Sequence, residues 1–359
     1  MNGPLAGVVI LSLAEQFPGP YATLLMADLG ADVIMVERPE GGDPARAFPD
    51  FFAAIARNKR SVALDLKAPQ DLARFKDFVK RADVVLEGYA PGVAARLGID
   101  YDSLKAINSK LIYGSISGFG QTGPYRDRRG HDLSYQAVSG LLFDQARLDG
   151  LTSLMPYGDI AAAMFAAFSV VTALFAREKT GNGTYIDVAA ADSLVSWMTP
   201  VLGPALNNGQ MIDVGKSPAY GLFKCEGGRV LSLSIAHEDH FWHRLCGLLD
   251  FGGEADMDHR SRISQSERLR EKIQARLGER ELANWAPDLD RLGIPWAPKS
   301  DIADVLVDPH FVQRGLFVDV RRATGSIERH VRQPVLFSDY ASNIARPSPS
   351  LGEHTDDDV

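Results

Sequence analysis

The feature of this sequence that most constrains its fold is the alternation of short apolar runs with amphipathic stretches in its first half. The apolar runs lack strict polar alternation, and they cover residues 7–11, 32–37, 61–66, 84–87 and 111–115. Helical patterns separate them, as at residues 21–29 and 70–81. Strands that alternate with helices predict an α/β fold with a parallel sheet, and near-continuous apolar strands indicate burial on both faces.

The second half of the chain continues this pattern and then starts a new one. Residues 159–178 are rich in Ala, Met and Phe and predict a long, mostly buried helix. Residues 201–219 are rich in Gly, Pro and Asn and predict a linker, and a second unit of strands and helices begins near residue 229. The tail, residues 346–359, is Pro-rich and then acidic, and its last residues are expected to be mobile.

Composition excludes several classes of protein. The two cysteines cannot form a disulfide framework or a paired metal site, so we expect no metal and a reducing, cytoplasmic setting. A net charge of −8 argues against nucleic acid as a partner. The apolar runs are broken by charge before they reach about 20 residues, so we expect no membrane span. The first residues do not have the pattern of a signal peptide.

The loops after the predicted strands hold few recognisable nucleotide motifs. Residues 14–20, after the first strand, lack the Gly-rich turn that cradles a pyrophosphate. A basic cluster at Arg57–Arg60 and Arg38, at the end of an earlier strand, could bind phosphate groups. The alternative is a solvated basic loop, which charge alone favours. The Gly-containing loops 87–92 and 118–124 allow close approach of a ligand, with plain turns as the favoured alternative.

Two acidic positions at helix starts could carry chemistry. His131 and Asp132 precede an apolar helix, where His131 could titrate near neutral pH and Asp132 could cap the helix. Asp159 opens the long helix at 159–178. It is either a capping residue, which is the simpler interpretation, or a carboxylate held at the positive end of a helix as a base or nucleophile.

Taken in order, these motifs resemble those of the class III CoA-transferases, the group that includes alpha-methylacyl-CoA racemases. The matching segments are Leu29–Ile34, Arg57–Ser61, Asp65–Lys67, Asp83–Tyr89, Pro91–Gly92, Arg96–Gly98, Gly118–Pro124, Gly130–Asp132 and Gly158–Asp159. The match covers residues 1–192 closely and 217–250 more loosely. One departure is Ala90, which stands where many relatives have a basic residue that contacts a CoA phosphate.

The resemblance implies a fold and a ligand. It implies a Rossmann-like parallel-sheet large domain (1–200, completed by 330–359), a linker (201–224), a smaller α+β domain (225–329) and an interlocked homodimer. Coenzyme A would enter as part of an acyl-CoA substrate, and no covalently bound cofactor is expected. The residues implied at the CoA site are Arg38, Arg57, Asn58, Lys59, Arg60, Glu87, Gly88, Tyr89, Pro91 and Arg96.

Two chemistries follow from the resemblance. In racemases, a His matching His131 and an Asp matching Asp159 exchange the alpha proton of a 2-methylacyl-CoA. Glu238 matches a Glu that supports this His from the partner subunit, and Asp132 would orient the same region. Because transferases usually carry an aromatic residue at position 131, we expect a racemase or epimerase. The alternative is a CoA-transferase in which Asp159 is the nucleophile, and a non-catalytic CoA-binding protein is a third hypothesis.

Overall fold

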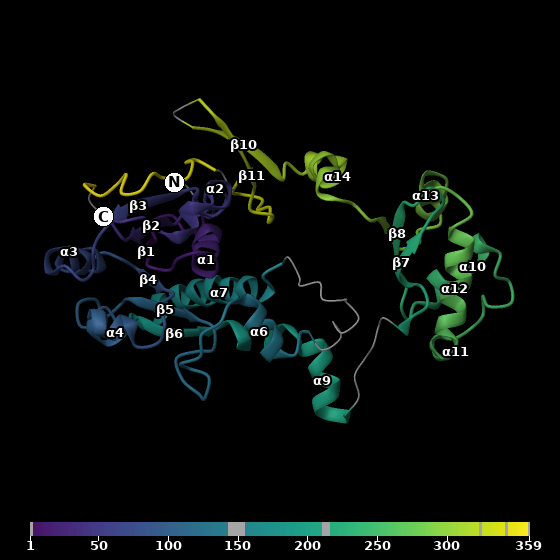
Figure 1. Cartoon of the computed structure of the whole chain (residues 1–359), viewed down its shortest axis with the longest axis horizontal. Coiled ribbons are helices and arrows are strands. Elements are labelled where there is room, and N and C mark those ends of the chain that lie inside the picture. Colours follow the sequence, from purple (N-terminus) through teal and green to yellow (C-terminus); the bar gives the residue numbers. More distant parts are fainter. Residues whose placement is uncertain (1–2, 143–154, 210–215, 323–324, 342–343, 358–359) are drawn as a thin grey trace. The chain divides into compact units, whose positions relative to one another are not determined.

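The computed structural model describes residues 3–142, 155–209, 216–322, 325–341 and 344–357. The chain divides into two compact units, one formed by residues 1–200 with 310–359 and the other by residues 201–309. The first unit is the larger, and both termini belong to it (Figure 1).

The large unit is built on a six-stranded, wholly parallel sheet with the order β3-β2-β1-β4-β5-β6. Its strands are β1 (Val9–Ser12), β2 (Asp32–Glu37), β3 (Lys59–Ala63), β4 (Val84–Glu87), β5 (Ile112–Ser117) and β6 (Thr184–Ala189). The strand order reverses between β1 and β4, which is where doubly wound sheets form a crevice at the carboxyl ends of their strands. The predicted α/β fold is confirmed.

Helices cover both faces of this sheet (Figure 1). One face is covered by α3 (Pro69–Val79), α4 (Val93–Leu97) and α5 (Tyr101–Lys105), and the other by α1 (Pro18–Ala27) and α7 (Tyr157–Thr180). Successive strand residues point to opposite faces. Leu11 therefore joins the core beneath α3, whereas Ile10 joins the core beneath α1 and α7. The remaining elements here are α2 (Pro49–Ala56), α6 (Asp132–Ser139), α8 (Ala190–Trp197) and the 3-10 helix η1 (Pro44–Ala47).

By length and composition, α7 could cross a membrane, and 44% of its most apolar window is buried. A single helix of this kind is weak evidence for a membrane span, because the core helix of a soluble protein has the same properties. Here α7 packs on α1 and α8 and continues the core of the sheet.

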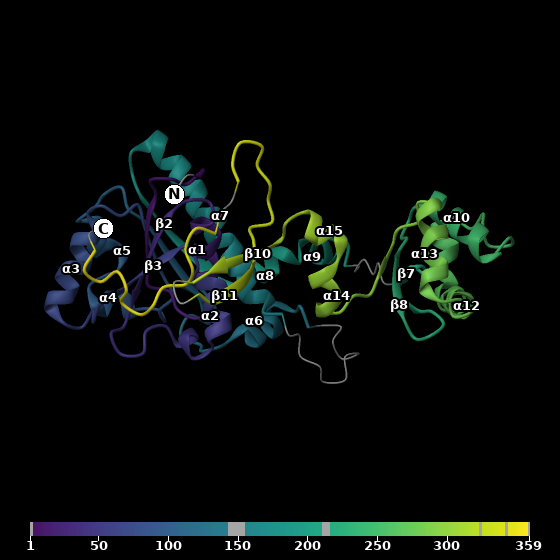
Figure 2. The ribbon, with the colours of Figure 1, turned by 90° about the horizontal axis from the view of Figure 1, so that it is seen from above.

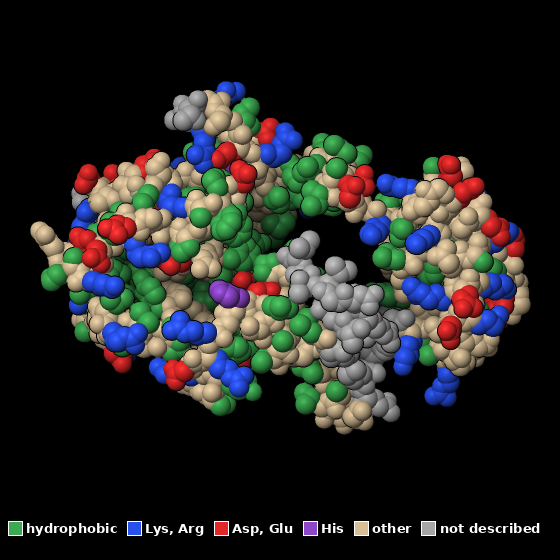
Figure 3. All heavy atoms as spheres, viewed as in Figure 1, with side chains coloured by type: hydrophobic (Ala, Val, Ile, Leu, Met, Phe, Trp, Pro, Cys, Tyr) green, Lys and Arg blue, Asp and Glu red, His purple; other side chains and the backbone are tan. Residues whose placement is uncertain are grey.

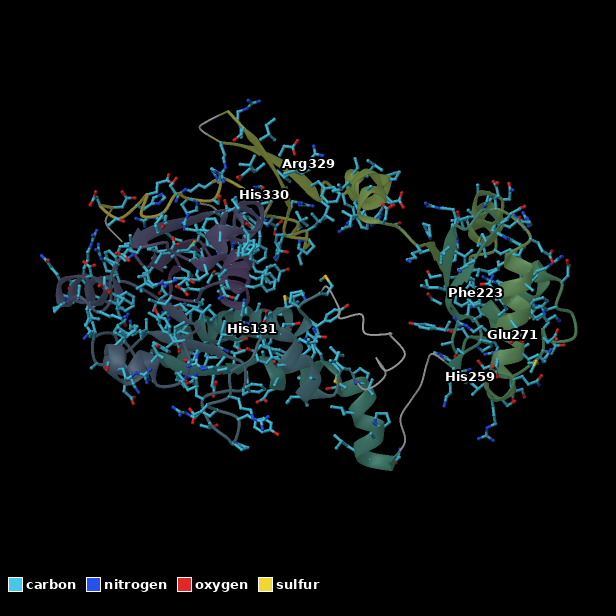
Figure 4. The ribbon with its side chains drawn as sticks, in the orientation of Figure 1. His131, Phe223, His259, Glu271, Arg329 and His330 are labelled. Carbon is cyan, nitrogen blue, oxygen red and sulfur yellow. The ribbon has the colours of Figure 1, made fainter. Side chains whose placement is uncertain are left out.

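The C-terminal part of the large unit contains α15 (Pro309–Gln313) and the antiparallel hairpin of β10 (Phe317–Arg321) and β11 (Ile327–Val331), which carries His330 (Figure 4). The tail then runs along β3 (Figure 2). The N–H of His354 donates to the carbonyl of Ser61 at 2.8 Å, and the N–H of Ala63 donates to Thr355 Oγ1 at 3.0 Å. This part of the tail is thus hydrogen-bonded to the edge strand, which would otherwise expose its backbone groups, and the last two residues, where mobility was expected, lie outside the described residues.

The second unit has a three-stranded antiparallel sheet of β7 (Tyr220–Lys224), β8 (Val230–Ser234) and β9 (Trp296–Pro298). The helices are α9 (Thr199–Asn208), which begins at the boundary, α10 (Asp239–Leu249), α11 (His259–Ser264), α12 (Ser266–Leu277), α13 (Leu282–Arg291) and α14 (Ile302–Val307). Its core is independent of the first unit and centres on the buried Trp242 and Trp285.

Candidate functional site

A cavity of about 230 Å³ opens at the carboxyl ends of β1, β4 and β5 in the large unit. Its walls come from residues 13–19, which run from β1 into the start of α1, from Gly88 and Tyr89 after β4, and from residues 116–118 at the end of β5. His131, Tyr135, Asp159 and Ala190 complete the lining. The cavity lies at the topological switch point, where ligands of such sheets bind. We refer to it as the reaction cavity.

Asp159 lies in the first turn of α7, but it does not cap this helix. Pro156 holds the capping position, and no hydrogen bond to the Asp159 carboxylate is found within the described residues. The cap comes instead from Asp132, whose Oδ1 accepts the N–H groups of Gly158 at 2.7 Å and of Asp159 at 3.2 Å. Asp132 therefore caps α7 rather than the helix it begins, and the Asp159 carboxylate is left for chemistry.

The electrostatic setting of Asp159 favours its protonated form. Burial raises the pKa of Asp159 to about 7, and the neighbouring charge of Asp132 adds to this increase. The effect of burial thus exceeds the stabilisation that a helix N-terminus gives to an anion. A carboxylate with a pKa near neutrality is ionised in about half of the molecules at neutral pH and is more basic than an exposed one.

His131 is exposed and directly precedes α6 (Figure 4), and a histidine is visible at the surface of the large unit in Figure 3. His131 lines the same cavity as Asp159. Tyr135, one turn further along α6, packs against Gly118 so closely that a Cβ there would lie 2.4 Å from the ring. Its hydroxyl donates to the carbonyl of Gly130 at 2.6 Å. The loop 118–130 and α6 are therefore held together next to Asp159.

A second cavity, of about 740 Å³, lies at the carboxyl ends of β2 and β3 and is bordered by α4. Its lining has three cationic residues, Arg38, Lys67 and Arg96, after which we call it the basic cleft, and also the acidic Glu15, Glu37, Glu40 and Asp65. Glu15 and Tyr89 line both this cleft and the reaction cavity, so the two adjoin. Arg38 pairs with Glu15 at 3.3 Å. An extended ligand with anionic groups at one end can therefore reach from the basic cleft to Asp159.

The predicted cluster Arg57–Arg60 does not line this cleft. Arg57 Nη2 donates to Asp28 Oδ2 at 2.7 Å and to the carbonyl of Val331 at 2.8 Å. Asn58 Nδ2 donates to Asp28 Oδ1 at 2.8 Å, and both side chains are buried. These residues precede β3, whereas ligands gather beyond the carboxyl ends of strands. Their contacts join α1, β3 and the C-terminal hairpin.

Lys59 and Arg60 likewise bind other residues of the large unit. Lys59 is 1% exposed and donates from Nζ to the carbonyl of Pro20 at 2.7 Å and to Thr23 Oγ1 at 2.9 Å. Burial lowers the pKa of Lys59 to about 7. Arg60 pairs with Asp32 at 3.1 Å, at the start of β2. Direct contacts of this cluster with CoA phosphates, as the resemblance implied, do not fit these positions.

Some of the CoA-site residues predicted in the loop after β4 line a cavity, and others do not. Gly88 and Tyr89 line the reaction cavity, whereas Glu87 is buried beneath them. One Glu87 oxygen accepts the N–H of Tyr89 at 2.6 Å, and the other accepts the Ser115 hydroxyl. Burial raises the pKa of Glu87 to about 7. Glu87 holds the cavity-lining loop, and Pro91 lines neither cavity.

Glu238 belongs to the second unit, directly before α10, and its Oε2 accepts the N–H of Ala236 at 2.9 Å. Its support of His131 from a partner subunit stays a prediction. Sequence reasoning also missed Glu15, Lys67 and Tyr135. Lys67 could have been found, because it stands in a matching motif and follows a predicted strand, which is where ligands of parallel sheets bind.

Several known proteins are similar to this chain in sequence and structure. The model of CoA-transferase family III matches residues 5–355. Succinate–glutarate CoA-transferase of Agrobacterium fabrum is 33% identical, covering 98% of this chain and 94% of its own. Acetyl-CoA:oxalate CoA-transferase of Acetobacter aceti is 29% identical, with coverages of 98% and 94%. A CAIB/BAIF family protein from Brucella suis superposes with a TM-score of 0.86 at 30% identity, covering 99% and 98%.

These relatives overturn the expectation of a racemase. The relatives reported above, together with succinyl-CoA:glutarate CoA-transferase of Mus musculus (31% identical, 98% and 85% covered), are named as transferases. The expectation depended chiefly on His131, with Glu238 and Asp132 as its supporting residues. An imidazole beside a carboxylate is compatible with either chemistry, because the carboxylate by itself can serve as the nucleophile. The alternative weighed from the sequence is the one that the relatives support.

Proposed function

The chain belongs to CoA-transferase family III, and we propose that it transfers coenzyme A from an acyl-CoA thioester to a carboxylic acid, with Asp159 as nucleophile. The observation that carries this proposal is the position of Asp159. Its half-buried carboxylate does not cap α7, and it lines a cavity that adjoins the basic cleft. The cleft would hold the phosphates of CoA, and Tyr89, which lines both spaces, would lie beside the pantetheine arm.

The reaction needs no redox step and no external proton. Asp159 attacks the thioester carbonyl, the C–S bond breaks, and CoA leaves as a thiolate while an acyl–aspartyl anhydride forms. The thiolate attacks the aspartyl carbonyl and displaces the first acid as its carboxylate, which leaves an aspartyl–CoA thioester. The acceptor carboxylate repeats the two steps in reverse, and Asp159 is regenerated as a carboxylate.

The surroundings of Asp159 suit this chemistry. Burial and the charge of Asp132 raise the pKa of Asp159 to about 7, so its anion is poorly stabilised before the attack. The anhydride is uncharged at this position, which relieves the repulsion from Asp132. Asp132 also fixes the first turn of α7 through two N–H groups, which holds Asp159 in place. Correct placement of a nucleophile is a large part of rate enhancement.

The size of the reaction cavity limits the size of the acid that can bind in it. Its volume of about 230 Å³ lies below the ~300–1,000 Å³ typical of pockets for drug-sized ligands. We therefore propose short-chain acids as substrates. The acids named for the relatives, such as succinate, glutarate and oxalate, belong to those proteins.

We further propose that the chain forms a homodimer in the cytoplasm. An apolar stripe of Met164, Phe168, Val171 and Phe175 lies exposed along α7, with side chains spaced to fall on one helix face. Exposed apolar surface of this kind is typical of protein interfaces. The family resemblance implies an interlocked pair of chains, and a second copy is the occupant we propose for this stripe. A net charge of −8 supports neither nucleic acid nor an anionic membrane as partner.

The nucleophile is tested by trapping. The protein is incubated with an acyl-CoA and then with hydroxylamine, and the tryptic peptide that contains Asp159 is analysed by mass spectrometry. We expect a hydroxamate on Asp159 and transfer of CoA to an added acid, both lost in Asp159→Asn. Transfer that persists in Asp159→Asn, or an adduct on another residue, would reject the proposal.

A further inference from the structure

Two arginines from separate elements meet at the edge of the basic cleft. Arg96 lies in α4, and Arg126 lies in the loop between β5 and α6. The Nη1 atom of Arg96 lies 3.5 Å, and the Nη2 atom of Arg126 lies 3.6 Å, from the point that a Cβ would occupy on Gly92. Both guanidinium groups therefore face the same small space above a glycine that has no side chain to fill it.

Arg126 is held in this position by its own loop. Its Nε donates to the carbonyl of Gln121 at 3.0 Å, and the N–H of Gln121 donates to Asp187 Oδ2 at 3.0 Å, on β6. Its Nη1 donates to Asp127 Oδ1 at 2.8 Å. The loop thus uses two of the three nitrogen atoms and leaves Nη2 pointing toward Gly92. An anchored guanidinium loses less conformational entropy on binding than a free side chain does.

Among the described residues, neither arginine has a buried acidic partner. The acidic partner of Arg126 is its sequence neighbour Asp127, whose side chain is 81% exposed. Arg96 makes no ion pair within the residues that the structure describes, although the cleft that it lines also holds acidic side chains, among them Glu15, which pairs with Arg38. Two like charges so close repel each other unless an anion lies between them.

We propose that Arg126 and Arg96 together bind one phosphate group at the nucleotide end of CoA. Guanidinium groups form strong, charge-assisted hydrogen bonds with phosphate oxygens, and the Nη1 of Arg96 and the Nη2 of Arg126 are near enough to share one phosphate. Arg126 thereby supplies a contact that Ala90 cannot make. Ala90 is exposed and lies two residues before Gly92 in the loop after β4. This inference rests on the proposed function, because it assigns a phosphate of the proposed substrate to two named residues.

The test compares two thioesters of the same acid, one with CoA and one with N-acetylcysteamine, which has no phosphate. In Arg126→Ala, the KM for the acyl-CoA is expected to rise about ten- to hundredfold, from the loss of one charged hydrogen bond. The kcat/KM for the N-acetylcysteamine thioester is expected to stay unchanged. Arg128→Ala is the matched control, because it removes an equal charge from the same loop, and the Arg128 guanidinium lies over the Tyr125 ring at 3.8 Å. It should change neither value.

A rescue variant separates binding from folding. Adding Ala90→Lys to Arg126→Ala places a cation back beside Gly92, and the KM for the acyl-CoA should return most of the way. If Arg126→Ala impairs both thioesters equally, or impairs neither, the proposal is wrong. Calorimetric titration with CoA and with pantetheine decides the matter even if the protein shows no transfer. Weaker binding of CoA alone by Arg126→Ala supports the arginine pair, and equal binding of CoA by both proteins overturns it.

Discussion

Asp132 and Asp159 are linked across two helices: the Asp132 carboxylate accepts the N–H of Asp159 at 3.2 Å, and its negative charge helps raise the pKa of the Asp159 side chain. One residue therefore both positions the proposed nucleophile and opposes its ionisation. Removing the charge while keeping the hydrogen bond separates these two effects.

Asp132→Asn is expected to move the pH dependence of transfer. Asp159 must be ionised to attack, so activity should fall as the pH drops below about 7 in the natural protein. With the charge of Asp132 removed, the pKa of Asp159 decreases and the acidic limb should move to lower pH. The amide oxygen can still accept the two N–H groups. In the natural protein Gln136 Nε2 donates to the other Asp132 oxygen, Oδ2. In the variant the Gln136 amide can rotate so that its Oε1, which has no partner in the described part of the chain, accepts from the new amide nitrogen.

The measurement for this variant is kcat as a function of pH. Asp102→Asn is the control, because it removes an equal charge from α5, on the other face of the sheet. An acidic limb that stays in place in Asp132→Asn would show that the Asp132 charge does not act on Asp159.

His131→Ala is expected to retain most of the transfer activity. In the proposed reaction, no proton leaves or joins carbon, so an imidazole at this exposed position is not required as an acid or base. A general acid or base typically contributes ~10²–10⁴ in rate. We expect kcat to fall by a factor far smaller than this range, and we expect hydroxylamine to trap Asp159 as before. A loss within that range would assign His131 a direct role in proton transfer.

Glu87→Gln is expected to make the protein more stable at alkaline pH. Burial raises the pKa of Glu87 from 4.5 to about 7, so the folded state binds its proton more tightly than the unfolded chain does. The contribution of this group to the free energy of unfolding is full below about pH 4.5 and is lost as the pH rises through about 7, by roughly 3 kcal/mol.

Urea unfolding at about pH 5 and at about pH 8 tests this expectation. The free energy of unfolding of Glu87→Gln should be larger than that of the natural protein at the higher pH and should equal it at the lower pH. Glu87→Ala should be less stable at both values, because the Tyr89 N–H then loses its acceptor. A natural protein whose stability does not change between these pH values would contradict the prediction.

Phe168→Asp is expected to weaken self-association. The Phe168 side chain is 68% exposed in the middle of the apolar stripe on α7, and a buried, unpaired charge at an interface is costly. Sedimentation equilibrium should show dimers for the natural protein and monomers at the same concentration for the variant. Phe48→Asp is the control, since Phe48 is exposed to 67% and lies before α2. Unchanged dimers in Phe168→Asp would exclude the stripe as the interface.

Much of the fold could be predicted from the sequence. Apolar runs such as residues 32–37 and 84–87 correspond to β2 and β4 with matching bounds. The long apolar helix was expected at residues 159–178 and spans Tyr157–Thr180. Hydrophobic periodicity reports which residues avoid water, and this local property survives in the tertiary structure. The same reasoning placed Asp159 at the start of a buried helix.

Only the tertiary structure decided what the charged residues contact. Arg57 and Lys59 have the composition of a phosphate site, yet α1 and the C-terminal hairpin cover them and supply carbonyl and carboxylate acceptors. Arg126 belonged to no predicted site, yet its loop brings it to Gly92 beside Arg96. A charged side chain binds whichever partner the folded chain brings to it, and for Arg57 and Lys59 the partners named here lie tens to hundreds of residues away along the sequence. Burial, in contrast, can be predicted from the pattern of apolar residues within each segment.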